Sequence, residues 1–159
     1  MSEDARFEDG GERPLNLGAF DAQDLAVLSA LVQDAVFPAT EIKWQPGLRR
    51  LGLLLNRLRW EDVEAAQKRG RPVERVQSLL VIDNVLGVAS QGIARGDADV
   101  VLSVLSVTFE VGEAPGGHVV LTLAGDGALR AEVEALEVSL RDVTRPYVAP
   151  SGKLPEHGE

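Results

Sequence analysis

Much of this chain alternates between apolar and polar residues with a period of two. The clearest example runs from Leu105 to Val111, with serine, threonine and glutamate at the positions between the apolar residues. Successive side chains of a β-strand point to opposite faces, so this pattern predicts a strand with one buried face. From the same alternation, or from short apolar runs, we expect strands at 15–20, 33–37, 41–45, 49–58, 74–82, 84–92, 104–111, 118–124 and 129–140.

One segment near the N-terminus has the period of a helix instead. Leu25, Leu28 and Val32 form a single apolar stripe, and Asp21 stands at the position of an N-cap. An aspartate at this position accepts a hydrogen bond from the first turn of a helix. We therefore expect a helix over residues 22–31.

These patterns together predict an α+β fold, dominated by antiparallel sheet, with one amphipathic helix near the N-terminus. Two packed sheets or a distorted barrel would both agree with the pattern. The polar stretch 61–72 contains a glycine and a proline, and we expect it to be an exposed excursion with at most a helical turn. Asp97 is expected to cap one further helical turn.

At two places in the predicted strands, the apolar residues switch between even and odd sequence positions. Residues 82–87 and 133–138 show the same change at an offset of 51 residues, and two shorter strands precede each of them. Such a change indicates a bulge or a sharp bend. The repetition is consistent with two related β-meanders, although any two bent aliphatic strands would look alike.

The length of 159 residues fits one domain. We expect this domain at 14–144, between a flexible acidic tail at 1–13 and a flexible C-terminal tail at 145–159. The chain has no cysteine, which excludes disulfides and thiolate metal sites. Its acidic first residues do not resemble a signal peptide, and no window has the roughly 18 apolar residues of a membrane span. A cytoplasmic protein without a membrane partner is therefore expected.

Charge is distributed unevenly along the chain. The net charge is −7 over residues 1–42, +5 over 43–75 and −7 over 76–159. The total of −9 makes the protein a poor general nucleic-acid binder, because phosphate contacts dominate that affinity. The basic region 43–75 is the part best suited to contact an acidic partner.

This basic region contains the best candidate for a binding site. If 41–45 and 49–58 form a hairpin, several bases and two tryptophans lie close together. Arginine and tryptophan are enriched at the energetic centres of protein interfaces, and a guanidinium stacked on an indole can also hold an anion. The candidate binding residues are Lys43, Trp44, Arg49, Arg50, Asn56, Arg57, Arg59 and Trp60. The alternative is that Trp60 belongs to the core and the arginines are edge charges that prevent sheet aggregation.

No group of residues has the spacing of a catalytic or metal site. His118 and His157 lack ligand-like neighbours, and Asp97 and Asp99 are not followed by ligands at calcium-loop spacing. The glycine-rich segment 112–117 contains no phosphate-binding motif. We therefore predict no catalytic residues, no metal site and no cofactor.

Four separated stretches resemble a known family. They are FDAQDLAVLSALVQDAV (20–36), LNRLRWE (55–61), VLSVLSVTFE (101–110) and EVEALEVSLRDV (132–143). In this order they are similar to an uncharacterised bacterial family described only as a domain of unknown function (number 2948). The resemblance covers residues 15–143. It implies a small stand-alone bacterial protein and assigns no catalytic or binding residue.

We expect from these features a non-catalytic cytoplasmic binding or accessory protein that contacts a protein partner through the 43–60 hairpin. Two alternatives stay open. An enzyme or small-anion-binding protein would use a pocket with a carboxylate such as Glu61 beside Arg57. A weak nucleic-acid binder would use the basic region 43–75. A homo-oligomer is compatible with the sequence.

Overall fold

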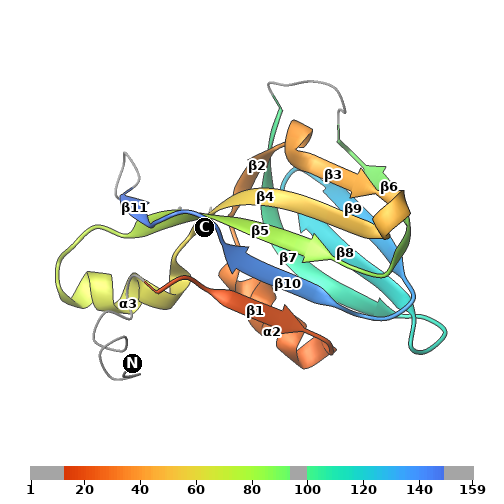
Figure 1. The fold of residues 1–159 in the computed structure, drawn as a ribbon. Coiled ribbons are helices and arrows are strands. Elements are labelled where there is room, and N and C mark those ends of the chain that lie inside the picture. The colour runs from red at the N-terminus through yellow and green to blue at the C-terminus, as the bar shows by residue number, and fades with distance from the viewer. Residues whose placement is uncertain (1–12, 94–99, 149–159) are drawn as a thin grey trace.

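The computed structural model describes residues 13–93 and 100–148. The strands and helices along these residues are β1 (Asn16–Ala19), α2 (Ala22–Leu31), β2 (Val36–Pro38), β3 (Ile42–Gln45), β4 (Arg50–Leu58), α3 (Trp60–Lys68), β5 (Glu74–Ile82), β6 (Val85–Gln91), β7 (Val101–Val111), β8 (Gly117–Leu123), β9 (Gly127–Val133), β10 (Val138–Asp142) and β11 (Tyr147–Val148) (Figure 1). Two 3₁₀ helices, η2 (Ala39–Glu41) and η3 (Pro46–Leu48), flank β3. The predicted helix at 22–31 and the strands predicted from their alternation are confirmed.

The strands of the described residues form one antiparallel sheet of 11 strands. Its main order is β1-β10-β5-β4-β2-β7-β8-β9-β6, while β3 also pairs with β4 and β11 with β5. The predicted α+β class with mostly antiparallel sheet is confirmed. The expectation of two packed sheets or a barrel is corrected to one large open sheet. The reason is β2, in which Val36 pairs with Asn56 on β4 and also with Ser103 on β7, so this short strand joins two groups of strands.

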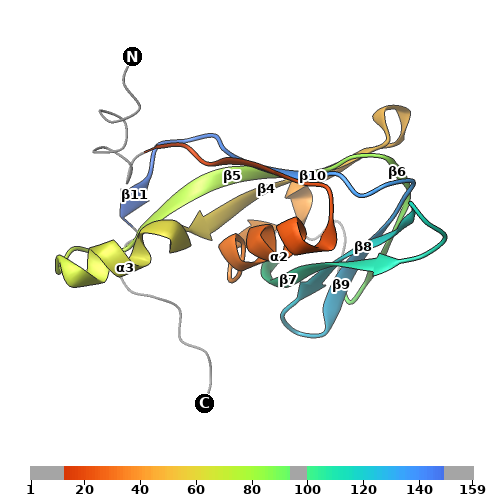
Figure 2. The same ribbon diagram turned by 90° about the horizontal axis from the view of Figure 1, so that it is seen from below.

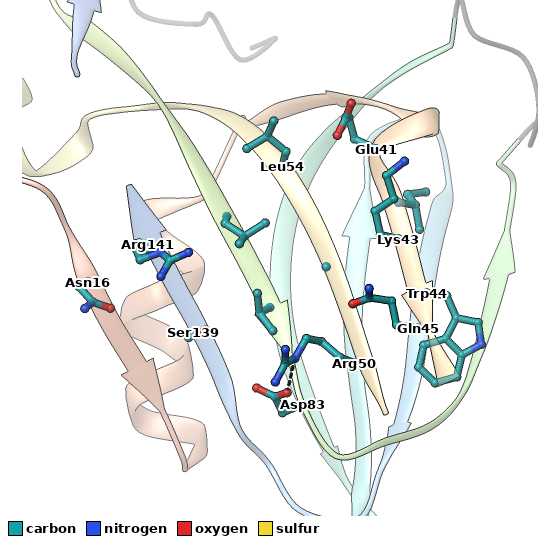
Figure 3. A pocket seen from close by; sticks show the side chains of 14 residues that line it. Asn16, Glu41, Lys43, Trp44, Gln45, Arg50, Leu54, Asp83, Ser139 and Arg141 are labelled. Carbon is teal, nitrogen blue, oxygen red and sulfur yellow. Dashed lines mark hydrogen bonds and ion pairs between the residues drawn. The ribbon is translucent and has the colours of Figure 1, made fainter. Parts of the chain in front are cut away.

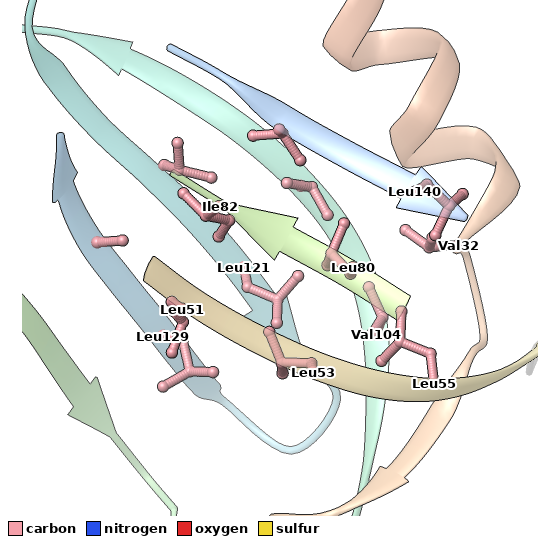
Figure 4. Packing of buried hydrophobic residues seen from close by; sticks show 14 of the residues in the cluster. Val32, Leu51, Leu53, Leu55, Leu80, Ile82, Val104, Leu121, Leu129 and Leu140 are labelled. Atoms are coloured by element: carbon pink, nitrogen blue, oxygen red, sulfur yellow. The ribbon is translucent and has the colours of Figure 1, made fainter. Parts of the chain in front are cut away.

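The sheet bends at β2, so that its two parts face each other (Figure 2). The first part consists of β1, β10, β5, β4 and β3, and the second of β7, β8, β9 and β6. One aliphatic core lies between them, with Leu53, Leu80 and Leu140 from the first part and Leu121 and Leu129 from the second (Figure 4). Burying one such leucine contributes about 1.5–3 kcal/mol, so this shared core is the main source of stability.

Helix α2 begins at the predicted N-cap. The Asp21 carboxylate accepts a hydrogen bond of 2.8 Å from the backbone N–H of Asp24. Leu28 is buried in the core, and the hydroxyl of Ser29 accepts a hydrogen bond of 2.8 Å from the N–H of Val107 on β7. Helix α2 therefore packs against β7 and β1 and covers one side of the space between the two parts of the sheet (Figure 2).

A second helix, α3, lies where the sequence predicted an exposed excursion. Trp60, Val63 and Ala66 recur at the spacing of a helix face and pack with Leu58 and Val73 in a small cluster apart from the main core. The prediction of a single helix is therefore corrected to two. Most other residues of α3 carry charged or amide side chains, which conceals its short apolar face in the sequence.

Both predicted changes of parity are bends where the chain passes from one part of the sheet to the other. Strand β5 continues into β6 through Asp83 and Asn84, and Asn84 has a positive φ of 61°. Strand β9 continues into β10 through residues 134–137. In each part of the sheet three strands pair in chain order, β3-β4-β5 in the first part and β7-β8-β9 in the second. The fourth strand of each part continues the third strand of the other part, because β10 follows β9 but pairs with β5, and β6 follows β5 but pairs with β9. This order agrees with two related β-meanders, whose common origin stays a prediction.

Several sequence-based expectations concern the ends and the loop before β7. Tyr147 and Val148, in the segment expected to be a C-terminal tail, form β11 and pair with β5. Asp97, expected to be a helix cap, and the tail residues 1–12 and 149–159 lie outside the described residues. Neither helix in the described part of the chain is long and apolar enough to cross a membrane.

Candidate functional site: a groove on the outer face of the sheet

The hairpin of β3 and β4 forms one wall of the candidate site. Its turn is η3, which begins with Pro46, and Arg49 leaves this turn in the left-handed region with a φ of 52°. Gln45 then pairs with Arg50, and the strands continue in antiparallel register. The predicted hairpin is therefore confirmed, and it lies at the margin of the first part of the sheet.

The floor of the site is the outer face of β4 and β5. The inward residues of β4 are core leucines, which leaves Gly52 and Leu54 on the opposite face. They pair with Val81 and Leu79 of β5, which point the same way. A Cβ added at Gly52 would meet no atom within 4 Å, so the glycine leaves open space above the sheet. The result is an apolar floor with a hollow at Gly52.

This floor lies in a groove with a volume of about 750 Å³ (Figure 3). Lys43, Trp44 and Gln45 of β3 line one side, and Ser139 and Arg141 of β10 line the other. The volume lies within the range of roughly 300–1,000 Å³ that is typical of ligand-binding clefts.

A smaller hollow of about 360 Å³ extends the groove toward Asn56 and Gln77. Both hollows are lined by Glu41 and Leu54, so together they follow β4 from Arg50 to Asn56. The six steps between these two residues span about 20 Å of strand. The two hollows together are therefore about 20 Å long in the direction of β4.

Charged side chains surround the apolar floor. The Nε of Arg50 donates a hydrogen bond of 2.8 Å to Asp83, and this bond together with the charge of Asp83 raises the pKa of Arg50 (Figure 3). Among the described residues, neither Lys43 nor Arg141 has an ion-pair partner. Three strand spacings and an offset of two residues along the strands, about 16 Å in all, separate the backbones of Lys43 and Arg141. The groove thus offers one unpaired cation on each side of its floor, together with the carboxylate of Glu41, which also lines it.

Arg49 and Asn56, which the sequence also placed in the site, contact other parts of the chain. Arg49 forms an ion pair of 2.6 Å with Glu134, in the bend between β9 and β10. Asn56 donates a hydrogen bond to the hydroxyl of Tyr147 on β11 and accepts one of 3.1 Å from Arg75. These contacts join the two ends of β4 to neighbouring segments.

Arg57 is fully buried, so its predicted place on a surface patch with the other bases is corrected. Its guanidinium donates to Ser78 at 2.9 Å, to the carbonyl of Leu58 at 3.0 Å, to both oxygens of Glu61 at 2.9 Å, and to Asp142 at 2.9 and 3.2 Å. All five N–H groups therefore have acceptors. Burial lowers the pKa of Arg57, but the two carboxylates outweigh this effect and the pKa is raised.

Arg59 is also buried, with 1% of its surface exposed, and is likewise corrected from a surface position. Its Nη1 donates to Glu74 and lies 3.4 Å from Asp62, while its Nε is buried without a hydrogen-bond partner. Asp62 accepts two hydrogen bonds from Arg71, at 2.7 and 2.9 Å. These bonds lower the pKa of Asp62, although its burial opposes the shift.

The two tryptophans lie in different places. Trp44 on β3 lines the groove and packs against the main core. Trp60 begins α3, packs in the small cluster beside that helix, and donates a hydrogen bond of 2.9 Å to the carbonyl of Gln33. The candidate residues therefore divide into Lys43, Trp44 and Arg50 at the groove and the remainder in contacts that stabilise the fold.

The groove also contains residues that the sequence did not connect with the hairpin. Arg141 and Ser139 are there because β10 pairs with β5, and Asn16 is there because β1 pairs with β10. The alternation along residues 138–142 marks Ser139 and Arg141 as outward-facing. No local pattern, however, indicates which strand they lie beside.

The chain belongs to the family described as Protein of unknown function (DUF2948), whose model matches residues 15–157. The resemblance found in the sequence is therefore confirmed, and the match includes both walls of the groove. No curated protein and no solved structure matches the chain. Its function therefore has to be argued from the groove.

Proposed function

We propose that this protein is a non-catalytic binding module of the bacterial cytoplasm that holds a short, extended, acidic segment of a partner protein in the groove. The main support is the arrangement of Lys43 and Arg141, two cations without ion-pair partners in the described chain, on opposite sides of an apolar floor. This arrangement favours a segment with carboxylates near both ends and an apolar side chain between them. The groove lining carries three cations (Lys43, Arg50 and Arg141) and two carboxylates (Glu41 and Asp83), a small positive excess in a chain whose net charge is −9.

The expected affinity is modest. Covering the floor with one large apolar side chain contributes about 1.5–3 kcal/mol. Each exposed carboxylate–cation pair adds about 0.2–1 kcal/mol. Because ordering the segment costs part of this gain, a Kd on the order of 1 mM is expected for a short peptide. Such an affinity suits a reversible contact that larger surfaces of the partner reinforce.

Two further observations favour binding of a protein segment over the alternatives. His118 lies on β8, in the second part of the sheet, so the described residues place no imidazole at the groove for acid–base chemistry. Arg57 and Arg59, which would supply much of the positive charge for nucleic-acid binding, are held in buried networks. The charge left at the groove suits a few carboxylates better than a polyphosphate chain.

A random peptide library displayed on phage and selected on the full chain tests this proposal. We expect enrichment of peptides in which two acidic residues, about four positions apart, flank an apolar residue. The blocking variant is Gly52→Phe, because its added side chain projects into open space above the floor and phenylalanine is favourable in strands. Loss of the selected peptides in this variant would support the groove as the site.

Two outcomes would contradict the proposal. Either no peptide class is enriched, or the enriched peptides bind Gly52→Phe as well as the original chain. Binding of single-stranded nucleic acid that weakens steeply with salt would support the nucleic-acid alternative instead.

A further inference from the structure

Residues 1–12 have the composition that the proposed function assigns to a ligand of the groove. Two acidic pairs, Glu3–Asp4 and Glu8–Asp9, flank the short segment Ala5-Arg6-Phe7. Each end therefore offers an acidic side chain on either face of an extended segment. The net charge of residues 1–12 is −4, counting side chains only.

The spacing of these residues agrees with the dimensions of the groove. When Phe7 faces the floor, Glu3 and Asp9 face the same way and lie six residues, about 20 Å, apart. Lys43 lies opposite Ser139 across three strand spacings, and Arg141 is two residues further along β10, so the backbones of Lys43 and Arg141 are about 16 Å apart. An acidic pair can thus lie at each cation while Phe7 covers the apolar floor.

The segment joins the described chain at Arg13, three residues before Asn16 at the edge of the groove. Asn16, four residues beyond the segment, lines the groove and pairs directly with Arg141. Gly10 and Gly11 can adopt the backbone conformations that a reversal of the chain requires. Twelve extended residues reach about 40 Å, whereas five adjacent strands are only about 19 Å wide. The tether is therefore long enough to lay the segment across the groove.

We infer that residues 3–9 of this chain bind in its own groove, with Glu8 and Asp9 at Arg141, Phe7 over the floor, and Glu3 and Asp4 at Lys43. This inference rests on the proposed function, because the segment acts there as a tethered competitor of the partner. A short tether gives an effective concentration in the millimolar range. Against a Kd on the order of 1 mM, the tethered segment occupies about half of the grooves and weakens partner binding about twofold.

A spin label on a single introduced cysteine locates the segment directly. The chain has no cysteine, so Ser2→Cys provides a unique attachment site in the full-length protein. We expect the label to broaden the amide NMR signals of Lys43, Leu54 and Arg141. Those of Thr108 and Val120, on the outer face of the second part of the sheet, should be unaffected.

The matched control neutralises the segment in the same labelled chain. Glu3→Gln, Asp4→Asn, Glu8→Gln and Asp9→Asn preserve its length and shape but remove its charge. The broadening at the groove should then be lost. Equal broadening with and without the four substitutions, or no broadening at the groove in either protein, would overturn the inference.

Titration with a free peptide separates this inference from the proposed function. A synthetic peptide of residues 1–12 should bind the neutralised full chain about twofold more tightly than the original chain. If a peptide selected from the library binds both proteins equally, the groove is a binding site but its own tail does not occupy it. If neither peptide binds either protein, both the inference and the proposed function are wrong.

Discussion

The guanidinium of Arg57 on β4 contacts both carboxylate oxygens of Asp142 on β10, at 2.9 and 3.2 Å, although 85 positions separate the two residues in the chain. Asp142 also accepts hydrogen bonds from Ser78 on β5, at 2.6 Å, and from the N–H of Leu15, at 2.9 Å. These contacts join β4, β5, β10 and the segment before β1. The outer faces of the same strands form the groove, so this buried network positions the candidate site from the opposite side of the sheet.

Removing the buried charge of Arg57 should strongly destabilise the fold. Arg57→Met leaves Asp142, whose side chain is 2% exposed, without its counter-charge. Loss of one partner of a buried ion pair typically costs about 3–5 kcal/mol. Urea unfolding should show this loss. The matched control is Arg130→Met, because Arg130 pairs with Glu110 at the surface and should contribute less than about 1 kcal/mol. Equal effects of the two substitutions would refute the structural role given to Arg57.

The stability of the protein should fall in acid partly through Asp62. Hydrogen bonds from Arg71 lower the pKa of Asp62 in the folded chain, against the opposing effect of burial. In the unfolded chain this carboxyl titrates near its ordinary value of about 3.9. The unfolded state then binds more protons over this range, so stability rises with pH. The contribution is complete above about pH 5 and is lost as the pH falls through the lowered pKa.

Asp62→Asn should therefore flatten the dependence of the unfolding free energy on pH below about pH 5. The measurement is urea unfolding at a series of pH values. Asp126→Asn, in the exposed turn before β9, is the control and should leave the slope near that of the original chain. An unchanged slope in Asp62→Asn would show that Asp62 does not contribute to the acid sensitivity.

Two glycines in strands should respond in opposite ways to alanine. Gly52→Ala places a methyl group in open space and should stabilise the protein by about 0.5–1 kcal/mol, because glycine is unfavourable inside a strand. At Gly117 a Cβ would lie 2.3 Å from the carbonyl oxygen of Glu110. Gly117→Ala should therefore cost about 1–3 kcal/mol. Thermal unfolding of both variants checks the difference, and destabilisation by Gly52→Ala would argue against the hollow in the floor.

Trp60 should affect stability without affecting the groove. Trp60→Phe removes the hydrogen bond to the carbonyl of Gln33, whose net contribution is about 0.5–1.5 kcal/mol. The substitution should not change the affinity for a selected peptide, since Trp60 belongs to the cluster beside α3. Peptide titration and urea unfolding of the same variant separate the two roles. A large loss of affinity in a protein of normal stability would restore Trp60 to the binding site.

The parts of the fold that depend on local patterns could be predicted from the sequence. The helix with Asp21 as its N-cap, the hairpin of β3 and β4, and the strands with clean alternation follow from periods of 3.6 and 2 and from turn residues. Helix α3 could not be recognised, because its apolar face has few residues and packs on a small cluster of its own. The joining of all strands through three residues of β2 also has no local signal.

The candidate site was predicted only in part. Lys43, Trp44 and Arg50 lie at the groove because neighbours in sequence form one of its walls. Arg57 has the same parity as the inward leucines of β4, which could have indicated an inward position. Its partner Asp142 and the opposite wall at Arg141 come from β10, and no local pattern shows that β10 pairs with β5. Long-range strand pairing therefore limits what the sequence alone reveals.

The most direct test of the proposed function is the affinity of a library-selected acidic peptide for the double variant Lys43→Gln, Arg141→Gln. Both residues are exposed and have no ion-pair partner in the described chain, so their loss should not disturb the fold. Isothermal titration at low salt should show binding weakened about tenfold, as expected for two exposed charge pairs of up to about 1 kcal/mol each. Arg130→Gln should bind like the original chain. Equal affinity of the double variant and the original chain would contradict the assignment of the groove as the binding site.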